Sequence, residues 1–220
     1  MNVIVLGATG MVGEGVLLEC IENPQVSKVL VIGRKKLGIK HQKVEELVIP
    51  DLLDLQSYSG SLTGFDACFY CIGKTSNGMS EQDYMVITFN ITIEIATVLK
   101  NSSPLITFCF VSGSRTDSTE KGTIMWARVK GKTENALIEL FGKNAYNFRP
   151  ALMKPSPGQK NFQGYNKLVH KTLFPLMKLF FPHNTIKQIA QAMIFVSANS
   201  YNKQILEVSD INYLINHNNE

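Results

Sequence analysis

The feature that most constrains the fold is a set of three glycines near the N-terminus. An apolar run, Val3–Leu6, leads directly into Gly7-Ala-Thr-Gly10-Met-Val-Gly13, and a helical pattern follows over Met11–Ile21. In a strand–turn–helix unit the first glycine permits a tight turn, the second lets the backbone approach a pyrophosphate, and the third lets helix and strand pack closely. The helix N-terminus then offers unpaired N–H groups to phosphates. The pattern predicts a dinucleotide-binding turn made by Gly7, Thr9, Gly10, Met11, Val12 and Gly13; the alternative is a glycine-rich turn without a ligand.

Short apolar runs alternate with helical patterns along the rest of the chain, which is typical of βαβ units. The expected strands are Asn2–Leu6, Lys28–Ile32, Glu45–Ile49, Asp66–Cys71, Thr107–Ser112, Tyr146–Arg149 and a late one near Gln204–Val208. The expected helices are Met11–Ile21, Glu81–Lys100, Ile124–Phe141 and Ile186–Ala198. The strands are almost wholly apolar, which suits strands covered on both faces. The sequence therefore predicts an α/β fold of the Rossmann type, doubly wound, with a mostly parallel sheet.

A chain of 220 residues can bury one substantial core, so we expect residues 1–220 to form a single domain. The alternation of strand and helix patterns ends after Pro150, where the loop Lys154–Gly158 precedes a helical stretch, Leu168–Phe181. We expect residues 151–220 to contribute a small cap over a substrate cleft. The apolar segment Leu173–Phe181 is too short to span a membrane; a membrane-surface contact and a homodimer contact are the alternatives to a lid.

Composition excludes several classes of protein. The net charge of +4 comes from scattered lysines without a basic run, which argues against nucleic acid as a partner. A strand beginning at Asn2 leaves no room for a targeting segment, so a cytoplasmic location is expected. Cys68 and Cys71 stand three apart in an apolar strand and should face opposite sides, so they cannot share a metal. The four histidines are dispersed, and no metal site is expected.

The residues after the second strand bear on the choice of cofactor. A carboxylate here would accept hydrogen bonds from the ribose 2′-hydroxyl of NAD, but the sequence reads Gly33-Arg34-Lys35-Lys36. A guanidinium can hold a 2′-phosphate through two parallel hydrogen bonds, so NADP is preferred over NAD. A solvated basic turn is the alternative. Asp51 and Leu52 are expected near the adenine, although Asp51 could equally cap the next helix.

The glycine spacing, Arg34 and Cys71-Ile72-Gly73 together resemble the short-chain dehydrogenase/reductase superfamily, in its atypical branch. Within that branch the chain is similar to Tat-interacting-protein-like oxidoreductases and to epimerase-like proteins. The resemblance implies that Cys71 and Gly73 lie by the cofactor, and that Pro150 shapes the nicotinamide pocket. It also implies that Ser112 or Ser114 is the active-site serine, and that Asn90 matches an asparagine that the superfamily carries on a helix. Each has an alternative: Gly73 could be only a loop hinge, the serines could only form turns, Asn90 could be a surface residue, and Pro150 could be purely structural.

The superfamily's Tyr-x-x-x-Lys pair falls on Trp126 and Lys130, so the lysine is kept and the tyrosine is replaced. The resemblance implies that Lys130 holds the nicotinamide ribose, while Trp126 would line the substrate site or simply pack in the core. An indole N–H has no usable acidity near neutrality, so the family's usual proton donor is missing. Arg128 and Lys132 lie elsewhere on this helix and are expected in solvent. Other side chains that could supply a proton are Tyr84, Tyr165 and Asp117, but no sequence spacing relates any of them to Lys130.

These observations leave two main hypotheses. The first is an NADP(H)-dependent oxidoreductase or isomerase acting on a small molecule near Ser112, Trp126 and the loop after Pro150. The second is a regulatory protein that senses NADPH without turnover. Nucleotide-sugar epimerisation is a weaker third, since it normally requires the missing tyrosine and a larger C-terminal domain.

Overall fold

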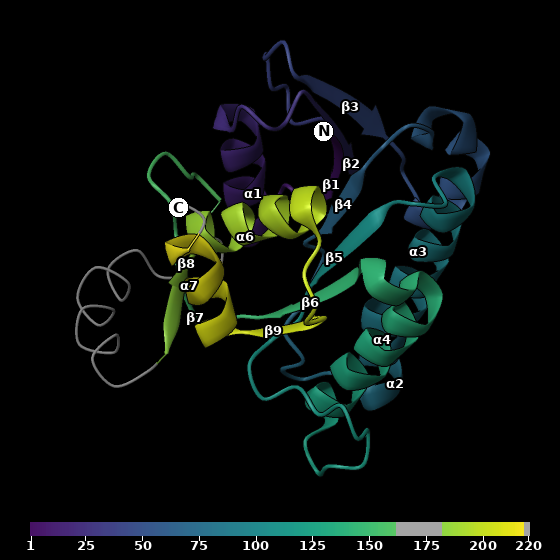
Figure 1. The fold of residues 1–220 in the computed structure, drawn as a ribbon. Coiled ribbons are helices and arrows are strands. Elements are labelled where there is room, and N and C mark those ends of the chain that lie inside the picture. The colour runs from purple at the N-terminus through teal and green to yellow at the C-terminus, as the bar shows by residue number, and fades with distance from the viewer. Residues whose placement is uncertain (162–181, 218–220) are drawn as a thin grey trace.

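Seven parallel strands form the centre of the molecule (Figure 1). The structure is a computed structural model, and it describes residues 1–161 and 182–217. The strands are β1 (Asn2–Leu6), β2 (Lys28–Gly33), β3 (Val44–Val48), β4 (Ala67–Tyr70), β5 (Thr107–Val111), β6 (Ala145–Arg149) and β9 (Ile205–Glu207). Their order is β3-β2-β1-β4-β5-β6-β9, and each neighbouring pair is parallel. The order reverses between β1 and β4, where doubly wound sheets bind ligands at the carboxyl ends of their strands.

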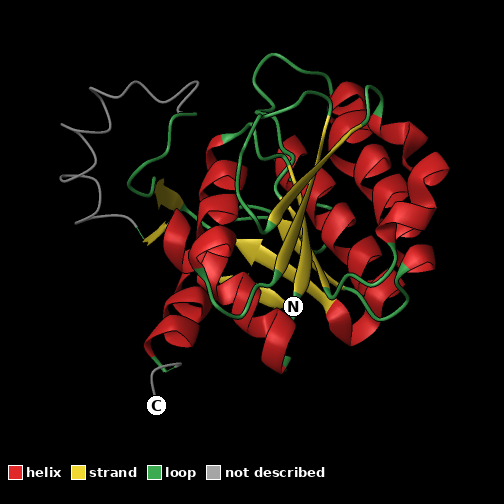
Figure 2. Cartoon of the chain, turned by 90° about the horizontal axis from the view of Figure 1, so that it is seen from above, coloured by secondary structure: helices red, strands yellow, loops and turns green. Residues whose placement is uncertain are grey.

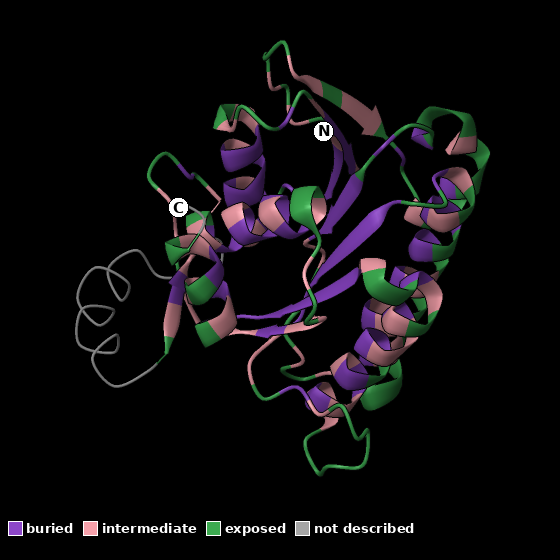
Figure 3. Ribbon diagram, in the orientation of Figure 1, coloured by how far each residue is buried: buried purple, intermediate pink, exposed green. Residues whose placement is uncertain are grey.

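Helices cover both faces of the sheet, as the view from above shows (Figure 2). One face carries α1 (Met11–Glu22), α6 (Ile186–Asn199) and α7 (Val208–Asn216). The other carries the 3₁₀ helix η1 (Leu52–Leu62), α2 (Glu81–Met85), the π-helical turn η2 (Val86–Asn90), α3 (Ile91–Ser102), α4 (Met125–Phe141) and the 3₁₀ turn η3 (Gly142–Asn144). The central strands between these layers are buried, whereas the edge strand β3 is partly exposed (Figure 3). The Rossmann-type α/β fold expected from the sequence is confirmed.

The expected strands match the observed ones to within about two residues, whereas several further elements were not expected. Residues 52–62 form η1, and α7 follows β9 directly. The helix expected over Glu81–Lys100 contains the π turn η2. That turn leaves the carbonyl oxygen of Thr88 to accept from Thr92 Oγ1 at 2.7 Å and from Thr133 Oγ1 of α4 at 3.4 Å. The contact from Thr133 joins two helices, and hydrophobic periodicity does not encode it.

The described residues after Pro150 divide between the main body and a smaller unit. Helix α6 packs against α1, and β9 extends the sheet beyond β6. Outside the body, β7 (Leu152–Lys154) pairs with β8 (His183–Thr185) in a two-stranded parallel sheet. The helical stretch expected at Leu168–Phe181 lies outside the described residues. Among the described helices, none has both the length and the apolar character that a bilayer span requires.

The cysteines lie in the core as free thiols. Cys68 packs with the apolar cluster beneath η1 and α3, and Cys71 packs with the cluster beneath α1 and α6. The two residues therefore face opposite sides of the sheet, as expected. Burial raises the pKa of all four thiols, that of Cys109 to about 12. They are suited to packing and not to nucleophilic chemistry.

Candidate functional site

The glycine turn joins β1 to α1 at the point where the strand order reverses. Gly7 has a φ of +85°, and a β-carbon there would lie 2.7 Å from the carbonyl carbon of Cys71, in the chain leaving β4. A β-carbon at Gly13 would overlap the carbonyl oxygen of Gly7. A β-carbon at Gly10 meets only Gly7 O at 3.4 Å, and its backbone is extended at φ −92° and ψ 164°. The fold itself therefore requires glycine at positions 7 and 13, but the packing around position 10 does not require a glycine there.

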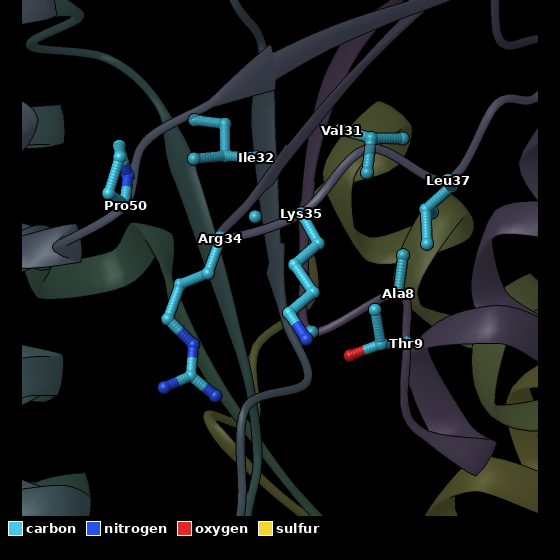
Figure 4. Close-up of a pocket in the computed structure, with 10 residues that line it drawn as sticks. Ala8, Thr9, Val31, Ile32, Arg34, Lys35, Leu37 and Pro50 are labelled. Carbon is cyan, nitrogen blue, oxygen red and sulfur yellow. The ribbon is translucent and has the colours of Figure 1, made fainter.

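A cavity of about 610 Å³ opens between this turn and the loop after β2 (Figure 4). In Figure 4 the side chains of Arg34 and Lys35 extend in the same direction from that loop, and Lys35 lies between Arg34 and Thr9. The described residues that line the cavity include no carboxylate: they are Gly7, Ala8, Thr9, Val31, Ile32, Gly33, Arg34, Lys35, Leu37 and Pro50. The cavity thus combines an apolar wall with two cations.

The cavity includes only some of the cofactor residues expected from the sequence. Gly7, Thr9 and Arg34 line it. Asp51 does not: its carboxylate accepts from Leu53 N at 3.1 Å and caps η1, and Leu52 packs against the core. Lys35 and the apolar residues of the wall were missed. The basic run 34–36 contained the signal for Lys35, whereas the contributions of Leu37 and Pro50 depend on how two loops fold against each other.

The other expected cofactor residues lie along the carboxyl edge of the sheet, outside this cavity. Met11 and Val12 start α1, and the backbone N–H of Cys71 donates to Leu6 O at 3.0 Å, which holds the end of β4 against β1. Gly73 is exposed, and a β-carbon there would meet nothing within 4 Å. Pro150 is buried at the end of β6, where its carbonyl accepts from Ser114 N at 2.9 Å. Asn90 is exposed at the end of η2.

Helix α4 places Trp126 and Lys130 beside the end of β5. Lys130 Nζ donates to the carbonyl oxygen of Val111 at 3.3 Å and lies 5.1 Å from the ring centre of Phe110. Burial lowers the pKa of Lys130 to about 8, and the charge of Glu134 partly opposes this shift. The ring of Trp126 faces the loop after β5, where a β-carbon on Gly113 would lie 3.9 Å from it. The two residues therefore flank the start of that loop.

Ser112 begins the same loop and is almost fully buried. Its Oγ lies 3.1 Å from Thr116 Oγ1, and Thr116 Oγ1 donates to the carbonyl oxygen of Gly113 at 2.7 Å. Because the hydroxyl proton of Thr116 is used in that bond, Ser112 is the donor between the two hydroxyls. Thr116 was not expected from the sequence.

The loop from Ser112 to Gly122 is fixed to α4 by contacts that the sequence analysis missed. Arg128 is not solvated as expected: it donates to Gly122 O at 2.6 Å and pairs with Glu81 at 2.6 Å. Lys132 is exposed, as expected, with its Nζ 4.9 Å from the ring centre of Phe89. A β-carbon at Gly131 would overlap the carbonyl oxygen of Asp117, so only glycine lets the loop cross the helix here. The Asp117 carboxylate accepts from Gly122 N at 2.7 Å and from the Thr119 hydroxyl at 2.6 Å, and these bonds lower its pKa.

Tyr84 and the buried charges of α4 are structural. Tyr84 is 2% exposed and burial raises its pKa, which makes it a poor proton donor. Glu134 is fully buried and accepts from Arg149 Nε at 3.0 Å and 3.1 Å, and Arg149 also pairs with Glu207 at 3.2 Å. Tyr165 lies outside the described residues. Within those residues, no group of His, Cys, Asp and Glu side chains is arranged to hold a metal ion.

Two polar side chains fix the loop after β7 to the start of α1. The carboxylate of Glu14 accepts from the backbone N–H groups of Lys160 at 2.8 Å and Asn161 at 2.7 Å. Gln159 is buried and donates to the carbonyl oxygen of Met11. Gly15 lacks a side chain where Gln159 and Ile186 approach, since a β-carbon there would overlap both. The first turn of α1 is thereby covered by a segment about 150 residues away in sequence.

Comparisons with known proteins agree with this architecture. The ADP-L-glycero-D-manno-heptose-6-epimerase of Helicobacter pylori superposes with a TM-score of 0.71 at 13% identity, over 98% of this chain and 81% of that one. The enzyme WbmF of Bordetella bronchiseptica, solved in complex with NAD+, gives a TM-score of 0.66 at 15% identity, over 94% and 72%. At these identities the likeness concerns the fold alone.

The sequence also resembles curated proteins. Protein HTATIP2 of Rattus norvegicus is 25% identical over 154 residues, which are 69% of this chain and 62% of that protein. Protein fmp52, mitochondrial, of Emericella nidulans is 26% identical over 159 residues, 69% and 66% of the two chains. The chain thus spans slightly less than two thirds of these relatives. The model of the NAD dependent epimerase/dehydratase family matches residues 3–120, more than half of the chain and including the glycine turn, β2 and the loop after β5. The chain belongs to the NAD dependent epimerase/dehydratase family.

Proposed function

We propose that the protein binds NADP(H) and acts as an oxidoreductase or isomerase on a small molecule. The observation that carries the proposal is the cavity in which Arg34 and Lys35 stand where NAD-selective members of such folds place a carboxylate. A guanidinium and an ammonium here favour a 2′-phosphate through charge-assisted hydrogen bonds. The free space at Gly10 supports a pyrophosphate in the turn, because nothing else in the fold requires glycine at that position.

Other residues have roles that follow from their positions. The first N–H groups of α1 would hold the pyrophosphate. Lys130 of α4, whose Nζ lies against the end of β5, would hydrogen-bond the nicotinamide ribose, and Pro150 and Gly73 would border the nicotinamide. When bound, the cofactor supplies hydride chemistry. The substrate would lie beside Trp126 and the loop that starts at Ser112, under the chain that follows Pro150.

Replacing Arg34 tests the cofactor preference. We expect Arg34→Ala to weaken NADPH binding about tenfold to a hundredfold, since a hydrogen bond to a charged group is worth roughly 1.5–3 kcal/mol. NADH affinity should hardly change, because NADH has no 2′-phosphate. Lys36→Ala is the matched control: Lys36 is exposed on the same loop but does not line the cavity. Calorimetric titration of each variant with both cofactors gives the answer, and equal losses for NADPH and NADH would remove the case for NADP.

The second candidate is a protein that senses NADPH without turnover, and Trp126 favours it. Carbonyl reduction needs a proton donor beside the substrate, which an indole cannot be near neutral pH. The hydroxyl of Ser112, moreover, donates its proton within the loop. We therefore expect the wild-type protein to bind NADPH yet show little carbonyl-dependent NADPH oxidation.

Trp126→Tyr separates the two candidates, because it places a phenol one helical turn from Lys130. A competent substrate pocket should then give measurable ketone or aldehyde reduction, followed by absorbance at the NADPH band, whereas the control Trp126→Phe should not. Robust wild-type reduction that persists in Trp126→Phe would show that another residue supplies the proton. No oxidation by either protein, with NADPH binding intact, would favour the sensor.

A further inference from the structure

The positive charges at the carboxyl edge of the sheet fall into two groups, and the proposed cofactor accounts for only one. Arg34 and Lys35 follow β2, on one side of the point where the strand order reverses. Lys74 and Arg115 follow β4 and β5, on the other side. That second side is where the proposed function places the substrate.

Lys74 and Arg115 occupy equivalent positions in neighbouring loops. Strands β4 and β5 are adjacent and parallel, with Tyr70 paired to Phe110 (Figure 1). Lys74 is the fourth residue after the end of β4, and Arg115 is the fourth residue after the end of β5. Both side chains are exposed. Two cations therefore leave the same edge of the sheet from adjacent strands.

Neither cation has a partner within the part of the chain that the structure describes. Two other arginines, in contrast, form ion pairs that hold elements of the fold together. Arg128 is paired with Glu81, and Arg149 with Glu134 and Glu207. The loop after β4, residues 71–80, contains no acidic residue. In the loop after β5, Asp117 accepts from Thr119 and Gly122, and Glu120 accepts from Asn135 Nδ2 at 2.7 Å. The acids of this region thus already have partners, and the two cations are left to attract an anion.

The loop that carries Arg115 is held in a defined conformation. Arg115 has a φ of +66°, in the left-handed region that costs an L-residue about 1–2 kcal/mol and that glycine adopts freely. The turn is fixed by Thr116, whose backbone N–H and hydroxyl donate to Gly113 O at 3.2 Å and 2.7 Å. Ser114 N holds it to Pro150 O at 2.9 Å. Glu120 of the same loop also has a positive φ, of +62°. The hydrogen bonds of Thr116 and Ser114 fix the position from which Arg115 leaves the loop.

We infer that Lys74 and Arg115 bind an anionic group, a carboxylate or a phosphate, on the small-molecule substrate. The inference rests on the proposed function, because it takes the substrate to lie on the β4–β5 side of the cofactor. An arginine can hold either anion with paired hydrogen bonds, and a lysine adds a second charge. Trp126, whose ring faces the loop bearing Arg115, would contact the uncharged part of the same molecule.

Trp126 is the only tryptophan, so its fluorescence reports on this part of the protein. Protein saturated with NADP+ is titrated with two pairs of probes that differ in one charged group. Succinate semialdehyde is compared with its methyl ester, and glycolaldehyde phosphate with glycolaldehyde. We expect the anionic member of at least one pair to bind at least about tenfold more tightly, with a preference that falls as salt is added. The pair that shows the preference identifies carboxylate or phosphate as the group recognised.

The variants are Lys74→Ala combined with Arg115→Gly, where glycine removes the charge and also relieves the positive φ. We expect the combined variant to lose the preference for the anion while NADP+ affinity, measured separately, is unchanged. Lys143→Ala is the control, because this exposed lysine lies in η3, just before the start of β6 at the opposite edge of the sheet. A preference that survives in the combined variant, or that is absent in wild-type protein that binds NADP+, would overturn this inference alone. Wild-type protein that does not bind NADP+ would instead overturn the proposed function.

Discussion

Gly7, Gly10 and Gly13 differ in what a side chain at each position would contact. At Gly7 it would meet the chain leaving β4, and at Gly13 it would meet the turn itself. These two glycines are explained by the fold. Gly10 is not, since its backbone is extended and its surroundings are open. At the scale of the residue, Gly10 is therefore the position where ligand binding and folding can be separated by experiment.

Gly10→Val should leave the fold intact and remove NADPH binding, because the side chain would fill the space that the pyrophosphate needs. We expect a loss of more than about a hundredfold in affinity, or about 2.7 kcal/mol, with a cooperative urea transition close to that of the wild type. Gly13→Val should behave in the opposite way and destabilise the protein strongly, since its side chain would overlap the backbone of Gly7. A folded Gly10→Val variant with unchanged NADPH affinity in calorimetry would show that the turn does not bind the pyrophosphate.

At the scale of the element, α4 has two parts with different tasks. Its first half carries Trp126 and Lys130 toward the loop after β5, and Gly131 lets that loop cross it. Its second half is fixed to the sheet by Glu134, which is fully buried and receives hydrogen bonds from Arg149 of β6. Arg149 continues this network to Glu207 of β9. The helix is thus anchored to the sheet by its second half and contacts the loop through its first half.

Glu134→Gln should destabilise the protein by about 3 kcal/mol, because removing one partner of a buried ion pair leaves the other charge buried without full compensation. Arg149 keeps its contact with Glu207, which places the loss near the lower end of the usual range. Lys203→Ala is the comparison: it removes an exposed pair with Asp210, and such pairs are worth about 0–1 kcal/mol. The free energies come from urea unfolding. A loss for Glu134→Gln no larger than that for Lys203→Ala would mean that Glu207 alone compensates Arg149.

At the scale of the whole molecule, the reversal of strand order between β1 and β4 divides the carboxyl edge into two halves. The β1–β2 half has the cavity with Arg34 and Lys35, and the β4–β5 half has Lys130, Trp126 and the cations Lys74 and Arg115. The C-terminal part of the chain connects to both halves. Glu14 and Gln159 hold the loop after β7 over the start of α1, and Pro150 holds the loop that begins at Ser112.

The sequence by itself determined the fold class, most strand positions and the glycine turn. Each of these depends on a local pattern: apolar runs bounded by turns, or glycines at a fixed spacing. It also pointed to Arg34, which lines the cavity, and the family resemblance implied that Trp126 stands in place of a tyrosine. These features need no knowledge of which segments meet in space.

Tertiary structure alone decided the features that depend on distant segments. Arg128 was expected in solvent, yet it is paired because α2 brings Glu81 against α4. The carbonyl oxygen of Thr88 in the π turn η2 accepts from Thr133 of another helix. Gly15 and Gly131 fall outside the dinucleotide motif. The approach of Ile186 and Gln159 explains Gly15, and that of Asp117 explains Gly131. In each case the contact joins residues that sequence periodicity cannot relate, because periodicity specifies which face of an element is buried but not which segment packs against it.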